Sequence, residues 1–289
     1  MDDDQPIIKS LLDLDFYKLT MAQVAWRLHP IVRVKYRFQN RTGRVNLAEF
    51  INEDRLRDEF VHVGALRFTS DEIDYLKSLN IFAESFLSYL PSLRMADVIV
   101  RSDRTDFQVE VCGSWPEAIL WETIILSIVN ELYYRAVLAR GGHYLPEVWI
   151  EGERRLVYKF NRMQAYPGIK FIEFGTRRRF SRRWQNYVVK RLKYAVPDNL
   201  LGTSNVLLAK THNLKPIGTF AHEMDMIYSG IFGDNDDSIR SSHQLVLKDW
   251  WGQYGEPLSI ALTDTFGTKF FFADFTPGLF KSHLVGELI

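Results

Sequence analysis

Four short apolar runs in the second half of the chain each end in Gly, Ser, Thr or Asp, and helical patterns follow them. The runs cover residues 171–174, 200–201, 216–217 and 259–262. A repeated succession of strand, polar tip and helix is typical of a parallel barrel or a doubly wound sheet. In both folds the active site lies at the carboxyl ends of the strands, so every polar tip is a candidate site position.

The first 140 or so residues lack this repetition and mix helical with strand patterns. Apolar side chains at helical spacing predict a helix over residues 14–28, with Asp13 or Asp15 as its N-cap. Residues 32–38 and 108–112 alternate between apolar and polar side chains, which predicts two half-buried strands. This part of the chain is therefore expected to be mixed α and β.

Two further helices have recognisable ends in the sequence. Thr69 and Glu72 have the spacing of a capping box, which predicts the start of a helix. Pro116 occupies a typical first helical position, and Gly141 and Gly142 mark the end of the long helix that follows.

The charge balance and the apolar stretches exclude several classes of protein. Basic and acidic residues number 36 each, so no net charge favours nucleic acid or an anionic membrane as a partner. The longest apolar stretch, residues 118–138, contains charged side chains and suits a buried amphipathic helix better than a membrane span. The chain does not open on a secretory signal pattern, and the single Cys112 permits no internal disulfide. A cytoplasmic or nuclear location is therefore expected.

A cluster of arginines follows the first of the four apolar runs. Its five members, at positions 177, 178, 179, 182 and 183, fall within seven residues. They indicate either an anion site, because guanidinium matches carboxylate and phosphate, or the solvated first turn of a helix with nucleic-acid contacts. The aromatic Phe174 beside the first arginine favours a pocket for a flat, anionic ring.

The other polar tips leave alternatives open. Ser204 lies in a stretch that is either a plain helix N-cap or a ligand donor at a strand end. His222, four residues past a glycine, is either structural or catalytic, and Asp264 is either a helix cap or a pocket acid. The remaining histidines and Cys112 show no metal-ligand spacing, so no zinc site is predicted.

Five segments together resemble nicotinate phosphoribosyltransferase of the kind found in fungi and many bacteria. They cover residues 10–21, 173–179, 202–205, 218–223 and 262–268, in the order of the family and at about its spacing. The similarity extends from about Pro6 to about Phe275.

The resemblance implies an N-terminal α+β domain, residues 1–140, followed by an incomplete irregular α/β barrel, residues 141–289, which carries the site. It implies that nicotinate and phosphoribosyl pyrophosphate give nicotinate mononucleotide and pyrophosphate in NAD salvage. ATP hydrolysis would drive this ligase-type glycosyl transfer, with Mg²⁺ as cofactor and a homodimer as the assembly.

The resemblance also assigns roles to single residues. His222 matches the histidine that ATP phosphorylates, and Thr219 matches a residue close to nicotinate. Phe174 matches the aromatic that stacks on the pyridine ring, and Arg177 matches the arginine beside it. Tyr17 matches the aromatic that covers the other ring face, reaching across from the partner subunit in dimers.

Ser204 and Asp264 complete the implied site. Related enzymes that use nicotinamide have an aspartate at the position of Ser204, which accepts from an amide but repels a carboxylate. A serine carries no charge and is able to donate to the carboxylate, so Ser204 favours nicotinate over nicotinamide. Asp264 matches an acid that positions the ribose or magnesium.

Beyond Phe275 the sequence departs from the family. An Arg-x-Asp-Ser-Gly-Asp segment and a Gly-rich loop for the ribose 5-phosphate, both expected there, are not found in residues 276–289. An open barrel with exposed strand edges is expected as a result. The alternative function is therefore a catalytically inactive truncated fragment that retains the nicotinate pocket or a dimerisation surface.

Overall fold

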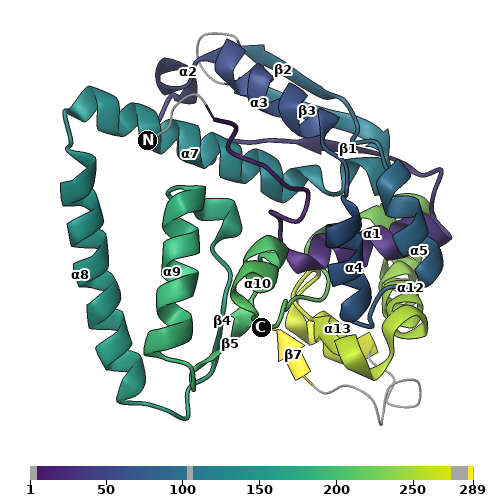
Figure 1. Cartoon of the computed structure of the whole chain (residues 1–289). Coiled ribbons are helices and arrows are strands. Elements are labelled where there is room, and N and C mark those ends of the chain that lie inside the picture. The colour runs from purple at the N-terminus through teal and green to yellow at the C-terminus, as the bar shows by residue number, and fades with distance from the viewer. Residues whose placement is uncertain (1–4, 103–106, 275–285, 289) are drawn as a thin grey trace.

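The computed structural model of the protein describes residues 5–102, 107–274 and 286–288, and Figure 1 shows it as mostly helical with small sheets. The longer helices are α1 (Phe16–Leu28), α3 (Glu53–Ala65), α4 (Ser70–Ser78), α7 (Trp121–Gly141), α8 (Leu145–Gln164), α9 (Arg182–Ala195), α11 (His222–Phe232) and α12 (Asp236–Tyr254). The shorter ones are α2 (Leu47–Phe50), α5 (Glu84–Tyr89), α6 (Trp115–Ala118), α10 (Val206–His212) and α13 (Thr268–Asp274). Three 3-10 turns are η1 (Leu90–Ser92), η2 (Thr176–Arg178) and η3 (Glu256–Leu258).

The N-terminal half contains one antiparallel sheet of order β1-β3-β2. Its strands are β1 (Arg33–Arg37), β2 (Val98–Ser102) and β3 (Phe107–Ser114). Both strands predicted from alternation, β1 and β3, are confirmed, and they pair with each other. Alternation works here because one face of the sheet packs on the core: Val109 and Val111 of β3 are fully buried, whereas the basic side chains of β1 remain exposed.

The predicted helix ends agree with the structure. Thr69 and Glu72 form the capping box at the start of α4, with both reciprocal bonds present. Gly142 ends α7 with a φ of 61°, a left-handed conformation in which glycine is favoured. Asp15 is the N-cap residue of α1, but its side chain makes no capping bond because it turns towards Ser204 instead.

The second half contains parallel pairs, as predicted. Strand β4 (Phe171–Glu173) pairs with β5 (Leu200–Thr203), and β6 (Ile260–Leu262) pairs with β7 (Gly286–Leu288). The predicted strand at residues 216–217 is wrong, since only a single parallel bridge joins Pro216 to Thr203. The ladder does not continue because the next amide, that of Asn205, donates to the Thr203 hydroxyl at the start of α10 (Val206–His212). The described strands therefore form separate small sheets and no closed barrel, in agreement with the expected incomplete α/β architecture.

The main hydrophobic core draws on both ends of the chain. Its members include Phe16, Trp115 and Trp121 from the first half and Tyr228 and Trp250 from the second. Helix α1 is buried along most of its length, so it lies inside the molecule, near α12 in Figure 1. The division predicted at residue 140 stays a prediction. No helix in the described residues is both long enough and apolar enough to cross a membrane.

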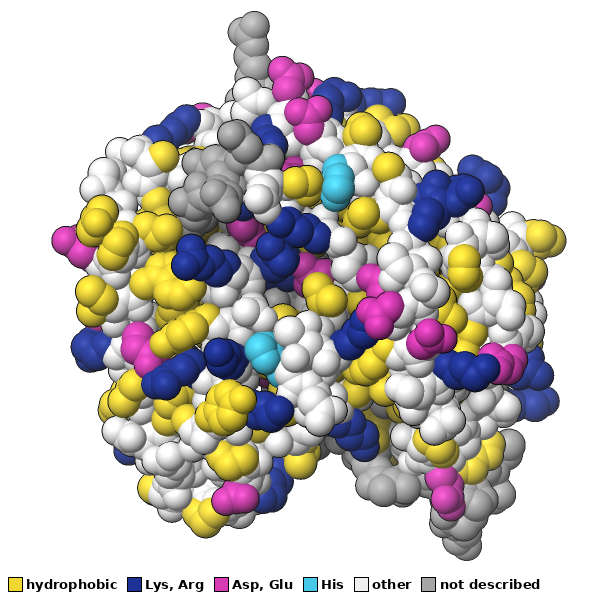
Figure 2. Space-filling model, in the orientation of Figure 1, with side chains coloured by type: hydrophobic (Ala, Val, Ile, Leu, Met, Phe, Trp, Pro, Cys, Tyr) yellow, Lys and Arg dark blue, Asp and Glu magenta, His cyan; other side chains and the backbone are white. Residues whose placement is uncertain are grey.

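A second, much smaller core joins α8 to α9. It consists of Leu156, Phe160, Leu192 and Val196. We call α8, α9 and this core the α8–α9 lobe. Figure 1 places α8 at the edge of the molecule, beside α9. Hydrophobic side chains of α8 such as Ile150 remain exposed, and Figure 2 shows hydrophobic side chains interspersed with basic and acidic ones over this face of the molecule.

Candidate active site

The start of α1 is joined to the ends of β4 and β5 by backbone hydrogen bonds. The Phe16 amide donates to the Ser204 carbonyl over 2.7 Å, and the Ser204 amide donates to the Glu173 carbonyl over 2.8 Å. The Val206 amide donates to the Leu14 carbonyl over 3.0 Å, at the start of α10. The polar tips of two neighbouring strands therefore meet the first turn of the central helix.

This junction brings Tyr17 and Phe174 face to face. Their ring centroids lie 6.4 Å apart and their planes differ by 14°. A planar ring held between two faces needs about 7 Å at ordinary carbon–carbon contact distances, so a slight separation of the rings would admit one. Both rings belong to the same chain, so the structure places Tyr17 opposite Phe174 within one subunit. A contribution of Tyr17 to the site of a partner subunit stays a prediction.

The arginine cluster divides into members with different surroundings. Arg179 is fully buried and donates both terminal nitrogens to Asp13, over 2.7 and 3.0 Å. Arg179 therefore belongs neither to an anion site nor to a solvated helix turn, because it forms a buried ion pair with Asp13. Arg177 is half-exposed, with Nη1 3.3 Å from Glu122 Oε1 and Nε 3.9 Å from Asp15 Oδ2. Arg177 is therefore the member that can reach an anion beside the two rings.

Ser204 is fully buried, and its hydroxyl donates to Asp15 Oδ1 over 2.6 Å. A hydroxyl has one hydrogen, and in this arrangement Ser204 directs it to Asp15; donation from Ser204 to nicotinate stays a prediction. Burial raises the pKa of Asp15, although the Ser204 hydrogen bond acts in the opposite direction. We call Asp15, Tyr17, Phe174, Arg177 and Ser204 the ring subsite.

Thr219 lies against the ring subsite with a hydroxyl that has no partner among the described residues. Its carbonyl accepts from Thr20 of α1 over 2.6 Å. The neighbouring Gly218 approaches α1 so closely that a Cβ there would lie 3.0 Å from the Tyr17 amide nitrogen. The Tyr17 hydroxyl is also buried and unpaired within the described residues, and burial raises its pKa well above the ordinary value. Both hydroxyls are thus donors available to a ligand.

Lys18 connects this region to the start of α11. The ammonium is fully buried and pairs with Glu122 and, over 2.6 Å, with Glu223. Burial raises the pKa of Glu223 to about 7, with Lys18 opposing and Glu122 reinforcing the shift. Because Glu122 also contacts Arg177, a continuous series of charges runs from the ring subsite to the residue next to His222.

His222 begins α11 and is half-exposed. Its Nδ1 lies 3.0 Å from the Thr265 hydroxyl, and its Nε2 lies 3.7 Å from Asp264 Oδ1. Asp264 and Thr265 follow β6, so two of the predicted polar tips meet here. We call His222, Asp264 and Thr265 the histidine subsite.

The structure thus gathers the predicted residues into two subsites linked through Lys18. The sequence indicated no site role for Lys18 or Glu122, and for Asp15 it indicated only a helix N-cap. A signal for the first two exists: each is a charged residue within an apolar helical pattern, which indicates a buried ion pair. No such signal pairs Asp15 with Ser204.

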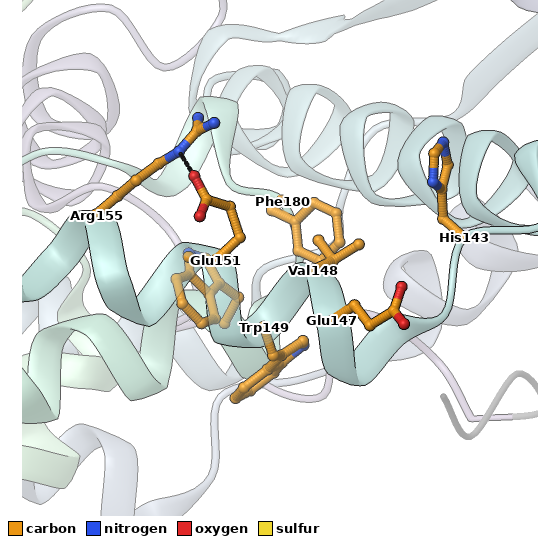
Figure 3. Close-up of a pocket in the computed structure, with 9 residues that line it drawn as sticks. His143, Glu147, Val148, Trp149, Glu151, Arg155 and Phe180 are labelled. Atoms are coloured by element: carbon orange, nitrogen blue, oxygen red, sulfur yellow. Dashed lines mark hydrogen bonds and ion pairs between the residues drawn. The ribbon is translucent and has the colours of Figure 1, made fainter.

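A separate cavity of about 470 Å³ lies against the α8–α9 lobe. Figure 3 shows Trp149, Val148 and Phe180 around it, with Glu151 paired to Arg155. None of the predicted site residues lines this cavity. In the described ranges, moreover, no group of three His, Cys, Asp or Glu side chains is placed to hold a metal ion.

Two family models match the chain. One, described as the N-terminal domain of nicotinate phosphoribosyltransferase, matches residues 12–130. The other, described as the nicotinate phosphoribosyltransferase family, matches residues 169–285. The second match continues past Phe275, where sequence analysis ended the similarity, so that boundary was wrong.

Solved structures agree with these matches. Nicotinate phosphoribosyltransferase from Porphyromonas gingivalis is 30% identical with a TM-score of 0.82, over 94% of this chain and 67% of that one. Nicotinate phosphoribosyltransferase from Vibrio cholerae is 31% identical with a TM-score of 0.84, over 98% of this chain and 66% of that one. The chain spans about two-thirds of the length of each.

Proposed function

The chain belongs to the nicotinate phosphoribosyltransferase family, and from this premise we propose that it forms nicotinate mononucleotide and pyrophosphate from nicotinate and phosphoribosyl pyrophosphate, with ATP hydrolysis. The single observation that carries the proposal is the pair of near-parallel rings of Tyr17 and Phe174, with a half-exposed arginine alongside. Two aromatic faces and a guanidinium complement a flat ring that bears a carboxylate.

The ring subsite supplies both binding and orientation. Nicotinate between Tyr17 and Phe174 would have its carboxylate within reach of Arg177, and Thr219 offers a buried hydroxyl as a further donor. Ser204 contributes by carrying no charge, since an acid there would face both Asp15 and the substrate carboxylate. Holding the flat nucleophile in one orientation supports its attack on the sugar of the donor.

The histidine subsite is the proposed site of phosphorylation by ATP. Neutral imidazole is a good nucleophile, and the half-exposure of His222 makes it accessible to a bulky phosphate donor. Asp264 beside it would position the ribose or hold Mg²⁺, which proteins commonly bind through one or two carboxylates together with substrate phosphates. Bound Mg²⁺ would supply positive charge that offsets the phosphates. The negative charge of a phosphorylated His222 would then position that ion and the sugar donor.

Nicotinate mononucleotide is a precursor of NAD, so the role proposed is NAD salvage in the cytoplasm. A homodimer is proposed from the resemblance to the family. Sedimentation of the purified chain decides the assembly: a mass of twice 33.8 kDa supports the dimer and a mass of 33.8 kDa opposes it.

Removing one aromatic face tests the nicotinate site. We expect Phe174→Ala to weaken nicotinate binding about tenfold, measured by calorimetry, because a stacking face contributes roughly 1 kcal/mol beyond simple burial. Tyr194→Ala removes an exposed aromatic ring of α9, outside the site, and serves as the matched control. Equal nicotinate affinity in the two variants, or no nicotinate binding by the unaltered chain, would overturn the proposal.

Radiolabelled ATP tests the histidine. Label from γ-labelled ATP should appear on the chain, be absent from His222→Asn, and accompany formation of nicotinate mononucleotide. Competition between nicotinate and nicotinamide decides which form of the vitamin is used. Nicotinate binding without label or product would retain the pocket but reject the enzymatic activity of this chain.

A further inference from the structure

A hydrogen-bonded series of side chains extends inward from His222. The Thr265 hydroxyl that contacts His222 Nδ1 over 3.0 Å also donates to Asp225 Oδ2 over 2.7 Å. The other oxygen of Asp225, Oδ1, lies 3.0 Å from Nδ1 of a second histidine, His243. These contacts join the consecutive helices α11 and α12 to the segment that follows β6.

The inner members of the series are shielded from water. Asp225 is fully buried and His243 nearly so. The rings of Phe266, Phe270 and Phe271 surround His243. A buried carboxylate is costly unless hydrogen bonds satisfy it, and Thr265 and His243 satisfy one oxygen each.

The direction of each hydrogen bond follows from this arrangement. A carboxylate only accepts, so Thr265 and His243 both donate to Asp225. The hydrogen of the Thr265 hydroxyl is thereby used, and towards His222 the same oxygen can only accept. Neutral His222 must then carry its hydrogen on Nδ1.

We propose that Thr265, Asp225 and His243 are positioning residues that fix the ring plane and tautomer of His222. The inference rests on the proposed phosphorylation of His222, because a nucleophilic imidazole needs its lone pair and its hydrogen at defined nitrogens. In catalytic triads a reactive side chain is likewise held in place by a series of hydrogen-bonded neighbours. Here the hydroxyl of Thr265, the buried carboxylate of Asp225 and the ring of His243 would hold His222.

A purely structural role would assign these residues only to joining α11 with α12. The contact between Asp225 and His243 does join them, so loss of either residue alone would not separate the two roles. Thr265 separates them, because its hydroxyl is the group that reaches His222. Thr265→Val removes the hydroxyl and preserves the shape, and Thr265→Ser preserves the hydroxyl.

Nitrogen NMR of the full chain with labelled histidine tests the geometry without requiring activity. His222→Asn identifies the signals of His222, and spectra at about pH 8.5 observe the neutral ring, since free imidazole has a pKa near 6.5. We expect the Nδ1–H tautomer in the unaltered chain and in Thr265→Ser, and a mixture of tautomers in Thr265→Val. A mixture in the unaltered chain, or no difference between Ser and Val, overturns the inference.

Asp225→Asn gives a second test that survives a failure of Thr265→Val to fold. His243 should keep its hydrogen on Nδ1 in this variant, because Nε2 has no partner in the described residues. That Nδ1–H then donates to the amide oxygen of the new side chain. The amide NH₂ would then donate to Thr265, which would turn its own hydrogen to His222 Nδ1. We expect His222 to change to the Nε2–H tautomer, and retention of the original tautomer contradicts the proposed series.

The functional consequence is measured separately. Thr265→Val should slow labelling of the chain by γ-labelled ATP about 10- to 100-fold, the range expected for a misoriented reacting group. Its nicotinate affinity should stay unchanged, whereas its melting temperature should fall because one oxygen of the buried Asp225 loses its donor. Thr265→Ser should restore both the labelling rate and the melting temperature. Equal labelling in Thr265→Val would overturn the inference and leave the proposed function intact. No labelling of the unaltered chain would reject the proposed phosphorylation, and the NMR result still decides the positioning.

Discussion

The ring subsite and the histidine subsite are built in opposite ways. In the ring subsite, Tyr17, Ser204 and Asp15 are buried, and backbone hydrogen bonds join three elements around them. In the histidine subsite, His222 and Asp264 are each about half-exposed, at 51% and 47%. A largely buried, hydrogen-bonded subsite suits a small flat ligand, whereas an exposed histidine suits successive contact with two large phosphate-bearing ligands. Stability and chemistry should therefore respond separately to mutation in the two subsites.

The largest effect is expected beneath the ring subsite. Arg179→Met leaves Asp13 buried without its charge partner and should lower the free energy of unfolding by about 3–5 kcal/mol. Arg178→Met, one residue earlier at an exposed position, should change it by less than about 0.5 kcal/mol. Urea denaturation of both variants provides the measurement. Similar losses of unfolding free energy in the two variants would show that the buried pair of Arg179 and Asp13 does not stabilise the region beneath the ring subsite.

Ser204→Asp tests the ring subsite itself. The new carboxylate would lie next to Asp15 and close to a bound nicotinate, all three being acidic and shielded from water. We expect nicotinate affinity to fall about 100-fold, equivalent to about 2.7 kcal/mol, and nicotinamide affinity to fall less. Competition binding of the acid and the amide measures the ratio. Ser204→Ala, which adds no charge, is the control, and an unchanged acid-to-amide ratio in Ser204→Asp would contradict the charge argument.

Glu223, between the two subsites, should make stability depend on pH. Its pKa of about 7 in the folded chain exceeds the model-peptide value of 4.5, so its stabilising contribution is complete below about 4.5 and is lost as pH rises through about 7. Burial alone would raise the pKa of Glu122, but Lys18 and Arg177 lower it, and the net shift is downward. Glu122 therefore does not titrate as the pH rises from about 4.5 to about 7.

The unfolding free energy should accordingly fall from pH 6 to pH 8 in the unaltered chain. Glu223→Gln should show a smaller fall over the same range, because it keeps the shape without the titrating proton. Denaturant titrations at the two pH values provide the comparison, and parallel pH dependence in both proteins would exclude Glu223 as the source.

The smallest effect on stability is expected at the histidine subsite. His222→Asn should change the free energy of unfolding by no more than about 0.5 kcal/mol, because the side chain is half-exposed and buries little apolar surface. The same variant should lose all labelling by ATP. Thermal denaturation measures the first result, and a loss of more than about 2 kcal/mol would show that the two subsites are not energetically distinct.

Local patterns predicted much of the fold. The alternation in β1 and β3, the capping box at Thr69 and the glycine end of α7 are all short-range features, and all are confirmed. The strand predicted at residues 216–217 is only a single bridge to Thr203, because the chain that would pair with it turns into α10 at Asn205. Burial of Arg179 depends on Asp13, 166 residues away, and no local pattern contains that partner.

The roles of the site residues stay predictions, although the structure brings several of these residues together. The resemblance named Tyr17, Phe174 and His222, and the structure places the two rings face to face. It could not indicate that the Ser204 hydroxyl is committed to Asp15, because that bond spans 189 residues. For Lys18 the sequence indicates a buried ion pair but not the partners, since an isolated charged residue in an apolar helix does not reveal them.

The small core of the α8–α9 lobe has a consequence for ligand entry. Phe171, at the start of β4, packs against that core, and β4 ends one residue before Phe174. Regions with few buried apolar contacts open locally at the lowest free energy, so amide hydrogens of α8 and α9 should exchange with solvent sooner than those of α1. Of the two aromatic faces, we therefore expect Phe174 to move when a ligand enters, because its strand packs on the smaller core, whereas Tyr17 lies on a helix buried in the main core.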